Sequence, residues 1–152
     1  MKTAQDYLGM AIDLAVRNVR DHGGQPFGTV LVKNGEVLAI GVNETGVTHD
    51  PSAHSEMQAI RTACRILKTP QLDGVVLYAS GVPCPMCLAA IRLAGIREVY
   101  YAYSDEDAAP FDFSTVSMYA EMAAPFTLPD MTIKHQPVST GENPYVVWGD
   151  RR

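Results

Sequence analysis

Apolar residues recur with helical spacing in two stretches of the chain, as expected of helices with one buried face. The first stretch ends at Gly23-Gly24, where a helix can stop in the left-handed conformation. The second follows Pro51 and Ser52, residues typical of a helix start. The positions that carry the two patterns are Tyr7, Met10, Ala11, Leu14 and Val19, and then Met57, Ile60, Cys64 and Leu67. We therefore expect an N-terminal helix and a second helix just beyond residue 52.

Other stretches have the short apolar runs of β-strands. Residues 26–43 predict two strands joined at Asn34-Gly35, a pair that favours a tight hairpin turn. Residues 74–80 are almost continuously apolar, which indicates a strand buried on both faces, and residues 97–104 predict another buried strand. Residues 131–136 indicate an edge strand.

Helical segments are expected between and after these strands, at residues 83–95 and, more weakly, at 114–123. The resulting order, α-β-β-α-β-α-β-α-β, predicts an α/β sandwich with helices on both faces of a mixed sheet. Because the sequence shows no repeat, low-complexity tract or linker, we expect one domain over residues 1–152.

Composition narrows the class of protein. The 152 residues are 47% hydrophobic and 19% charged, and 12 basic against 17 acidic side chains give a net charge of −5. This balance argues against general affinity for nucleic acid or an anionic membrane. Charged residues interrupt the N-terminal apolar pattern, and no apolar run is long enough to span a bilayer, so we expect a cytoplasmic protein.

Three side chains have the right chemistry for zinc: His54, Cys84 and Cys87. Each is predicted to lie at a helix start, where side chains tilt back toward the N-terminus and the helix dipole favours thiolates. Cys64 lies ten residues beyond His54, about 15 Å along the helix axis, and is expected in the core. Three ligands leave one coordination position for water, as in catalytic rather than structural zinc sites.

Glu56 follows His54 by two residues and can reach past that ligand from the first helical turn. A carboxylate there could take a proton from the water and deliver it to a ring nitrogen and then to departing ammonia. We therefore predict that Glu56 is the catalytic residue of a zinc hydrolase that removes an amino group.

The pattern H-x-E…P-C-x-x-C is the signature of zinc deaminases, and the chain resembles the cytidine deaminase-like superfamily. Within it, the similarity to bacterial guanine deaminases is strongest and extends to about residue 119. The shared motifs are Pro26-Phe27-Gly28, Gly41-Val42-Asn43, Asp50-Pro51-x-Ala53-His54-x-Glu56 and Pro83-Cys84-Pro85-Met86-Cys87. The resemblance implies a three-layer α/β/α sandwich with a mixed five-stranded sheet, a Zn²⁺ cofactor, a homodimer, and hydrolysis of guanine to xanthine and ammonia.

The resemblance also implies substrate contacts. It casts Asn43 as an amide that hydrogen-bonds the base and Phe27 as an aromatic side chain that packs on the ring. Ser55 and Pro83, which adjoin the metal ligands, are expected beside the substrate. Asp112 is the candidate for recognition of the far edge of the base.

Several positions depart from the pattern of the guanine deaminases. Ser55 replaces the usual Ala, and Val82 replaces the Glu that usually precedes P-C-x-x-C. An ungapped match places Thr115 opposite a recognition carboxylate, which Asp112 supplies only after a shift in register. The C-terminus, which ends shortly after Trp148, looks shorter than the tail that closes the site of the family's partner chain. These changes leave the zinc chemistry intact but leave the identity of the base open.

Other functions therefore stay in view. Cytosine, isocytosine or an amino-triazine could replace guanine as substrate, and the same motif occurs in tRNA adenosine deaminases. The acidic net charge makes a nucleic-acid substrate the weaker alternative. A thioredoxin-like redox protein would need C-x-x-C but neither His54 nor Glu56. A protein that zinc merely stabilises would not need Glu56 beside an open coordination position.

Overall fold

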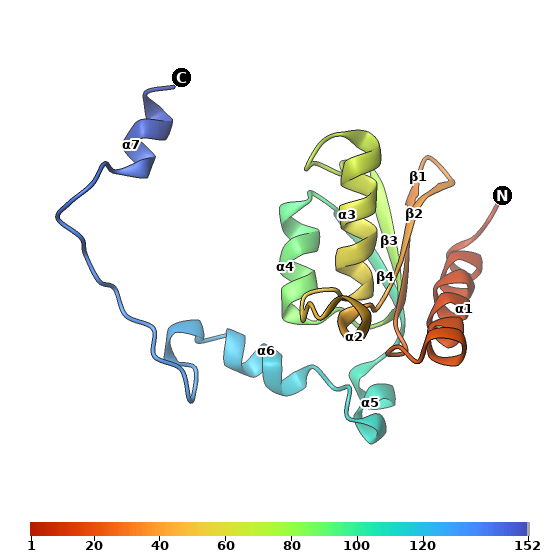
Figure 1. Cartoon of the computed structure of the whole chain (residues 1–152). Coiled ribbons are helices and arrows are strands. Elements are labelled where there is room, and N and C mark those ends of the chain that lie inside the picture. Colours follow the sequence, from red (N-terminus) through yellow and green to blue (C-terminus); the bar gives the residue numbers. More distant parts are fainter. Residues whose placement is uncertain (152) are drawn as a thin grey trace.

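The computed structural model describes residues 1–151. Its strands are β1 (Gly28–Lys33), β2 (Glu36–Val42), β3 (Val75–Gly81) and β4 (Glu98–Tyr103). Its helices are α1 (Ala4–His22), α2 (Thr45–Thr48), α3 (Ser55–Leu67), α4 (Pro85–Leu93), α5 (Asp105–Ala108), α6 (Val116–Met122) and α7 (Pro144–Gly149), with short 3-10 turns η1 (Ala109–Phe111) and η2 (Pro125–Thr127). The predicted order of the longer elements is confirmed as far as α6 (Figure 1).

The strands form a mixed sheet in the order β2-β1-β3-β4. β1 pairs antiparallel with both β2 and β3, and β3 pairs parallel with β4. The β1–β2 hairpin turns at Asn34-Gly35, where both residues have positive φ, as the sequence predicts. The described residues give the sheet four strands, so the expectation of five was wrong.

The error concerns the last two predicted strands. Residues 131–136 form no strand and lie in an extended stretch between α6 and α7, away from the sheet (Figure 1). β4 is consequently an edge strand. The sequence predicts that it is buried, but five of its six residues are exposed. Of these, Tyr100 stacks on Tyr78 of the adjacent strand at 5.3 Å, so it still contributes to packing.

Helices lie on both faces of the sheet, α1 on one side and α3 with α4 on the other (Figure 1). Two glycines permit close packing: a Cβ at Gly28 would come within 2.4 Å of the Ala11 carbonyl in α1. A Cβ at Gly41 would come within 2.2 Å of the Ser55 carbonyl, where α3 begins. The start of α3 is thereby held directly against β2, which fixes the residues of its first turn.

The boundaries of α1 agree with the sequence pattern, whereas α3 begins later than expected. α1 ends at Gly23, which has a φ of 63°. α3 begins at Ser55 rather than near residue 52. The Asp50 carboxylate instead accepts hydrogen bonds from the backbone N–H and the hydroxyl of Ser52, which makes a turn before the helix.

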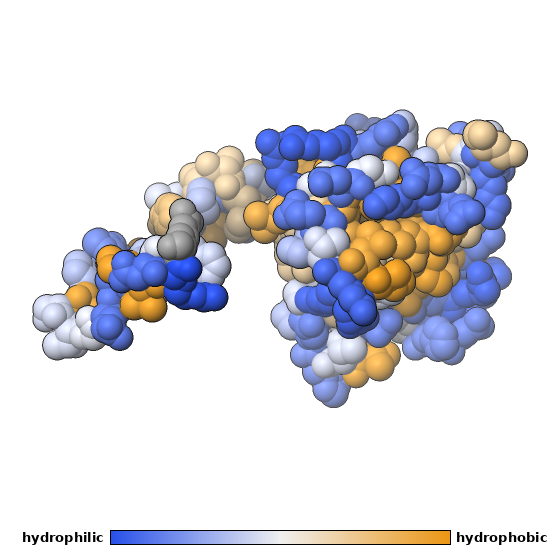
Figure 2. Space-filling view, turned by 90° about the horizontal axis from the view of Figure 1, so that it is seen from above, coloured by the Kyte–Doolittle hydropathy of each residue, from blue (hydrophilic) through white to orange (hydrophobic). Residues whose placement is uncertain are grey.

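The segment beyond β4 differs from the rest of the molecule. Figure 2 shows its last part standing clear of the main body, with apolar side chains on its surface. None of the helices formed by residues 1–151 combines the length and apolar character that crossing a lipid bilayer requires.

Candidate metal centre and active site

Two helix starts bring the predicted metal ligands together. His54 is the residue that precedes the first turn of α3, and Cys84 is its counterpart in α4. Both have extended backbone conformations, and neither side chain caps its own helix within the described chain. Cys87 lies in the first turn of α4. Because β1 runs antiparallel to both β2 and β3, these two strands run in the same direction, and the helices that follow them begin at the same end of the sheet (Figure 1).

The cluster has the dimensions of a zinc site. Nδ1 of His54 lies 3.5 Å from Sγ of Cys84 and 3.6 Å from Sγ of Cys87. Tetrahedral zinc, with Zn–N of about 2.0 Å and Zn–S of about 2.3 Å, separates a nitrogen and a sulfur ligand by about 3.5 Å. All three ligand atoms lie within 4.8 Å of one another, and both cysteines are buried. The residues therefore fit the ion in number, type and spacing.

Hydrogen bonding within the cluster favours a thiolate. The pKa of the Cys84 thiol is lowered to about 4, first because Cys87 donates a hydrogen bond to its sulfur and also because His54 does so. The pKa of Cys87 is raised, because its proton is held in the bond to Cys84 and because the thiol is buried. The pKa of the His54 imidazole is raised by its hydrogen bond with Cys84. A bound cation displaces protons from such groups.

Glu56 lies beside these ligands, 5% exposed, and is one of the residues that line a cavity. Zinc with an open coordination position supplies a water that is activated at neutral pH. Glu56 can accept a proton at the cavity wall and return it to a leaving group, which is the role predicted for it. The structure thus brings all four residues of the predicted zinc and proton-transfer machinery to one place.

The cavity has a volume of about 800 Å³, large enough for a heterocyclic base. His54, Glu56 and Cys84 lie on its wall. The opposite side is formed by the exposed face of α1, including Val16 and Val19. Further wall residues come from the ends of β3 and β4, from α5 and α6, and from Phe111 of η1 with the loop that follows it.

Three of the predicted recognition positions lie on this cavity wall. The Phe27 ring packs edge-on against Phe113, with 5.2 Å between ring centroids. Asp112 and Thr115 are also wall residues. The backbone N–H and the hydroxyl of Thr115 donate to Asp105 at 2.7 and 2.9 Å, so Thr115 is already engaged. Asp112 is an exposed residue of the cavity wall, and its contact with a base stays a prediction.

Asn43 is buried behind the wall rather than on it. Its Oδ1 accepts hydrogen bonds from the N–H and the hydroxyl of Thr45, and its Nδ2 donates to Gln25 Oε1 at 3.3 Å. Asn18 of α1 donates to the backbone carbonyls of both Asn43 and Gln25 at 2.9 Å. Gln25, which the sequence analysis missed, lines the cavity. A contact between Asn43 and a base stays a prediction.

Ser55 and Pro83 are buried next to the metal ligands. The Ser55 hydroxyl donates to Glu56 Oε1 at 2.6 Å. The Pro83 carbonyl accepts a hydrogen bond from the Tyr119 hydroxyl, which ties α6 to the start of α4. Neither residue is part of the cavity wall, and their contacts with substrate stay predictions.

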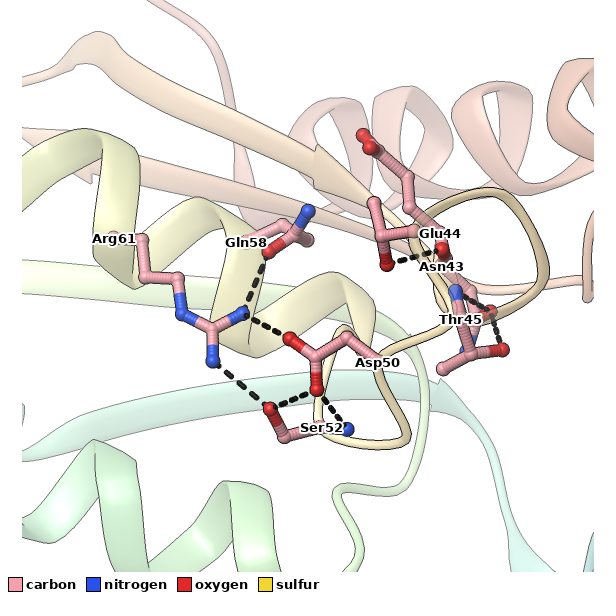
Figure 3. Close-up of polar contacts among 8 residues, drawn as sticks. Asn43, Glu44, Thr45, Asp50, Ser52, Gln58 and Arg61 are labelled. Atoms are coloured by element: carbon pink, nitrogen blue, oxygen red, sulfur yellow. Dashed lines mark hydrogen bonds and ion pairs between the residues drawn. The ribbon is translucent and has the colours of Figure 1, made fainter.

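The loop that carries His54 is fixed by a polar network on its outer side (Figure 3). Arg61 of α3 donates to Ser52 Oγ at 3.0 Å and to Gln58 Oε1 at 2.8 Å. It also lies 3.8 Å from the Asp50 carboxylate, the pKa of which is lowered chiefly by hydrogen bonds from Ser52. Arg61 was not singled out from the sequence, where it looks like one more charged residue on an exposed helix face.

Thr29 is a second residue that the sequence analysis missed. It is fully buried in β1, and its hydroxyl lies 2.9 Å from Ser55 Oγ and 3.2 Å from Glu56 Oε1. The available signal was a polar residue directly before the apolar run Val30-Leu31-Val32 and directly after Pro26-Phe27-Gly28. Buried polar groups usually have a specific partner, so such a residue indicates an unseen contact.

Comparison with known proteins places this site in a family. Residues 1–103 match the model of the cytidine and deoxycytidylate deaminase zinc-binding region. The chain is 40% identical over 146 residues to guanine deaminase from Bacillus subtilis, covering 95% of this chain and 92% of that protein. It is 41% identical over 97 residues to tRNA-specific adenosine deaminase from Agrobacterium fabrum, covering 62% of this chain and 64% of that protein.

The structural comparison extends this similarity. The crystal structure of guanine deaminase from Bacillus subtilis superposes with a TM-score of 0.91 at 36% identity, covering 98% of this chain and 95% of that chain. The chain therefore belongs to the cytidine and deoxycytidylate deaminase zinc-binding family. It is a hydrolytic deaminase that acts on a C–N bond, and its cofactor is Zn²⁺.

Proposed function

We propose that this deaminase converts free guanine to xanthine and ammonia. The observation that carries the proposal is the extent of the similarity: it spans 95% of the chain against guanine deaminase but 62% against the tRNA-specific enzyme. The match to guanine deaminase thus includes most of the segment beyond residue 103, where the cavity wall residues of η1 lie. That segment is where substrate selection is expected.

In this proposal Glu56 carries the proton during hydrolysis and the ligands His54, Cys84 and Cys87 hold zinc. Phe27 packs on the base, Asn43 supports its recognition through the amide, and Asp112 accepts hydrogen bonds from its far edge. The geometry that supports these roles is the common cavity wall formed by Phe27, Glu56 and Asp112, with Asn43 joined to it through Gln25.

Ammonia release from a panel of free bases tests the substrate. We expect guanine to be deaminated by the zinc-loaded protein, with cytosine, isocytosine and an amino-triazine much slower. A guanine-inactive enzyme that deaminates one of the others would reject the proposal. Adenosine deamination in tRNA, with binding that weakens steeply as salt rises, would favour the RNA-editing alternative despite the net charge of −5.

We also propose that residues 1–152 form one three-layer α/β/α domain that functions in the cytoplasm as a homodimer. Apolar side chains beyond β4 support the dimer: Phe126 is 79% exposed, Tyr145 85% and Trp148 56%. Exposed apolar groups in such number are characteristic of an interaction surface. The exposed apolar face of α1 beside the cavity is a matching surface for α7 of a second copy.

A complementation experiment tests this dimer. One chain carries Glu56→Ala, and the other is truncated after residue 140, so that it lacks α7. If α7 completes the partner's site, each chain alone is inactive, and the co-refolded mixture regains activity through one intact site per dimer. If α7 folds back on its own chain, the mixture stays inactive. A monomer in light scattering would contradict the dimer directly.

A further inference from the structure

Two buried hydroxyl groups converge on one oxygen of Glu56. Ser55 Oγ lies 2.6 Å from Glu56 Oε1, and Thr29 Oγ1 lies 3.2 Å from the same oxygen. The two hydroxyl oxygens are 2.9 Å apart. Thr29 and Ser55 are both 0% exposed, so these groups have no access to bulk water. Thr29 comes from β1, whereas Ser55 and Glu56 begin α3.

The number of protons limits how these contacts are used. Each hydroxyl has one hydrogen to donate, so the three contacts cannot all be hydrogen bonds at once. The two short distances define a chain in which Thr29 donates to Ser55 and Ser55 donates to Glu56. Hydrogen bonds arranged in series polarise one another, so Thr29 strengthens the bond that Ser55 makes to the carboxylate.

The two hydroxyl groups act on the same oxygen of Glu56, Oε1. A carboxylate has two oxygens, so engagement of Oε1 leaves Oε2 as the oxygen for proton transfer. Proton transfer requires the carboxylate to be held within hydrogen-bond reach of the reacting group. A displacement of about 1 Å can slow an enzymatic step by about 100-fold. The orientation of the Glu56 carboxylate is therefore expected to determine the rate of proton transfer.

We propose that Thr29 and Ser55 are positioning residues that hold Glu56 in its proton-transfer orientation. The inference rests on the role assigned to Glu56 in the proposed function, but not on guanine as the substrate. Ser55 in this view serves the substrate through Glu56 rather than by touching it.

Single substitutions that remove one hydroxyl test the proposal: Thr29→Val and Ser55→Ala. On the base that the wild type deaminates, we expect kcat to fall by about 10- to 100-fold and KM to change by less than about 2-fold. Thr29→Ser restores the hydroxyl and is expected to retain most of kcat. Thr62→Val, the same change at a half-buried position of α3 remote from Glu56, is the matched control and should leave kcat unchanged.

Two further measurements separate positioning from a structural tie between β1 and α3. Zinc content should stay near one ion per chain in every variant. The melting temperature should fall only as far as the lost side-chain contacts require, and this fall should not correlate with the decrease in kcat. If Thr29→Val and Ser55→Ala melt earlier but keep wild-type kcat, the hydroxyls serve stability only and the proposal is wrong.

Crystal structures of the same variants give a readout that needs no turnover. We expect the Glu56 carboxylate to rotate or to occupy more than one orientation in Ser55→Ala, and to a lesser extent in Thr29→Val. A carboxylate that keeps its wild-type orientation in both variants would overturn the proposal. A wild type that deaminates none of the tested bases would instead count against the proposed function, while this structural comparison still decides the positioning role.

Discussion

The part of the chain up to the end of β4 and the part beyond it are built differently. The first holds the buried groups, including Leu31, Leu77, Cys84, Cys87 and Glu56, together with the half-buried His54. In the second, none of the described residues is buried, and large apolar groups such as Phe126 and Trp148 face solvent. Both contribute to the same cavity. The metal cluster therefore lies in the well-packed part of the molecule, whereas the proposed substrate contact at Asp112 comes from a segment that has little packing of its own.

Loss of a metal ligand should have the largest effect, because it removes the zinc site from the well-packed part of the molecule. We expect Cys84→Ser to abolish detectable deamination and to reduce zinc content well below one ion per chain, since a hydroxyl is a poor substitute for a thiolate. Cys64→Ser is the matched control and should keep both zinc and activity, because Cys64 packs against the core instead. Retention of zinc and activity by Cys84→Ser would contradict the assignment of the site.

The double substitution Thr29→Val with Ser55→Ala tests whether the two buried hydroxyl groups act on Glu56 in series. If Thr29 acts through Ser55, the double variant should have nearly the same kcat as Ser55→Ala alone, about 10- to 100-fold below wild type. Steady-state kinetics of the three variants measure this. Effects that multiply would mean that each hydroxyl donates to Glu56 independently.

Substitution of Asp112 tests whether the segment beyond β4, in which this residue lies, contributes to substrate recognition. We expect Asp112→Asn to raise KM for guanine by about 10-fold, as loss of a charged hydrogen-bond acceptor predicts, with kcat changed much less. Asp130→Asn is the control: this aspartate also has a positive φ, but it is not part of the cavity wall. Equal KM values for the two variants would exclude Asp112 from recognition.

The smallest effect is expected at the outer loop before His54. The pKa of Asp50 is lowered by hydrogen bonds from Ser52 and by Arg61, so its contribution to stability is present above pH 3.8 and is lost as the pH falls through the lowered pKa. Ser52→Ala should lower the melting temperature by about 2 °C or less at pH 7, with the difference shrinking below about pH 4. A difference that grows on acidification would have the wrong sign for this interpretation.

Local patterns in the sequence were sufficient for much of the fold and for the metal centre. Asn34-Gly35 determines its turn through the φ values of two adjacent residues, and the spacing of His54, Cys84 and Cys87 reflects side-chain chemistry that few other sites share. Such signals need no knowledge of distant packing.

Contacts between distant parts of the chain could not be predicted in this way. Thr29 reaches Glu56 across 27 positions, and Gln25 reaches Asn43 across 18. The strand expected at residues 131–136 has the right local pattern, but in the described chain this segment does not pair with the open edge of β4. The exposure of β4 follows from the same missing neighbour, because burial of a strand depends on what lies beside it.

His54 and Cys84 occupy the positions at which helices usually receive a capping side chain. A Ser, Thr, Asp or Asn there typically contributes about 1 kcal/mol to its own helix. In this protein both side chains turn instead toward a point shared by two helices. Across residues 1–151 each helix therefore lacks such a side-chain cap, and the two side chains instead connect segments that lie 30 residues apart in the chain. Hydrogen exchange of the backbone amides in the first turns of α3 and α4 should therefore depend on whether the metal centre is intact. Fraying of these two helix ends would then indicate loss of the metal centre on which activity depends.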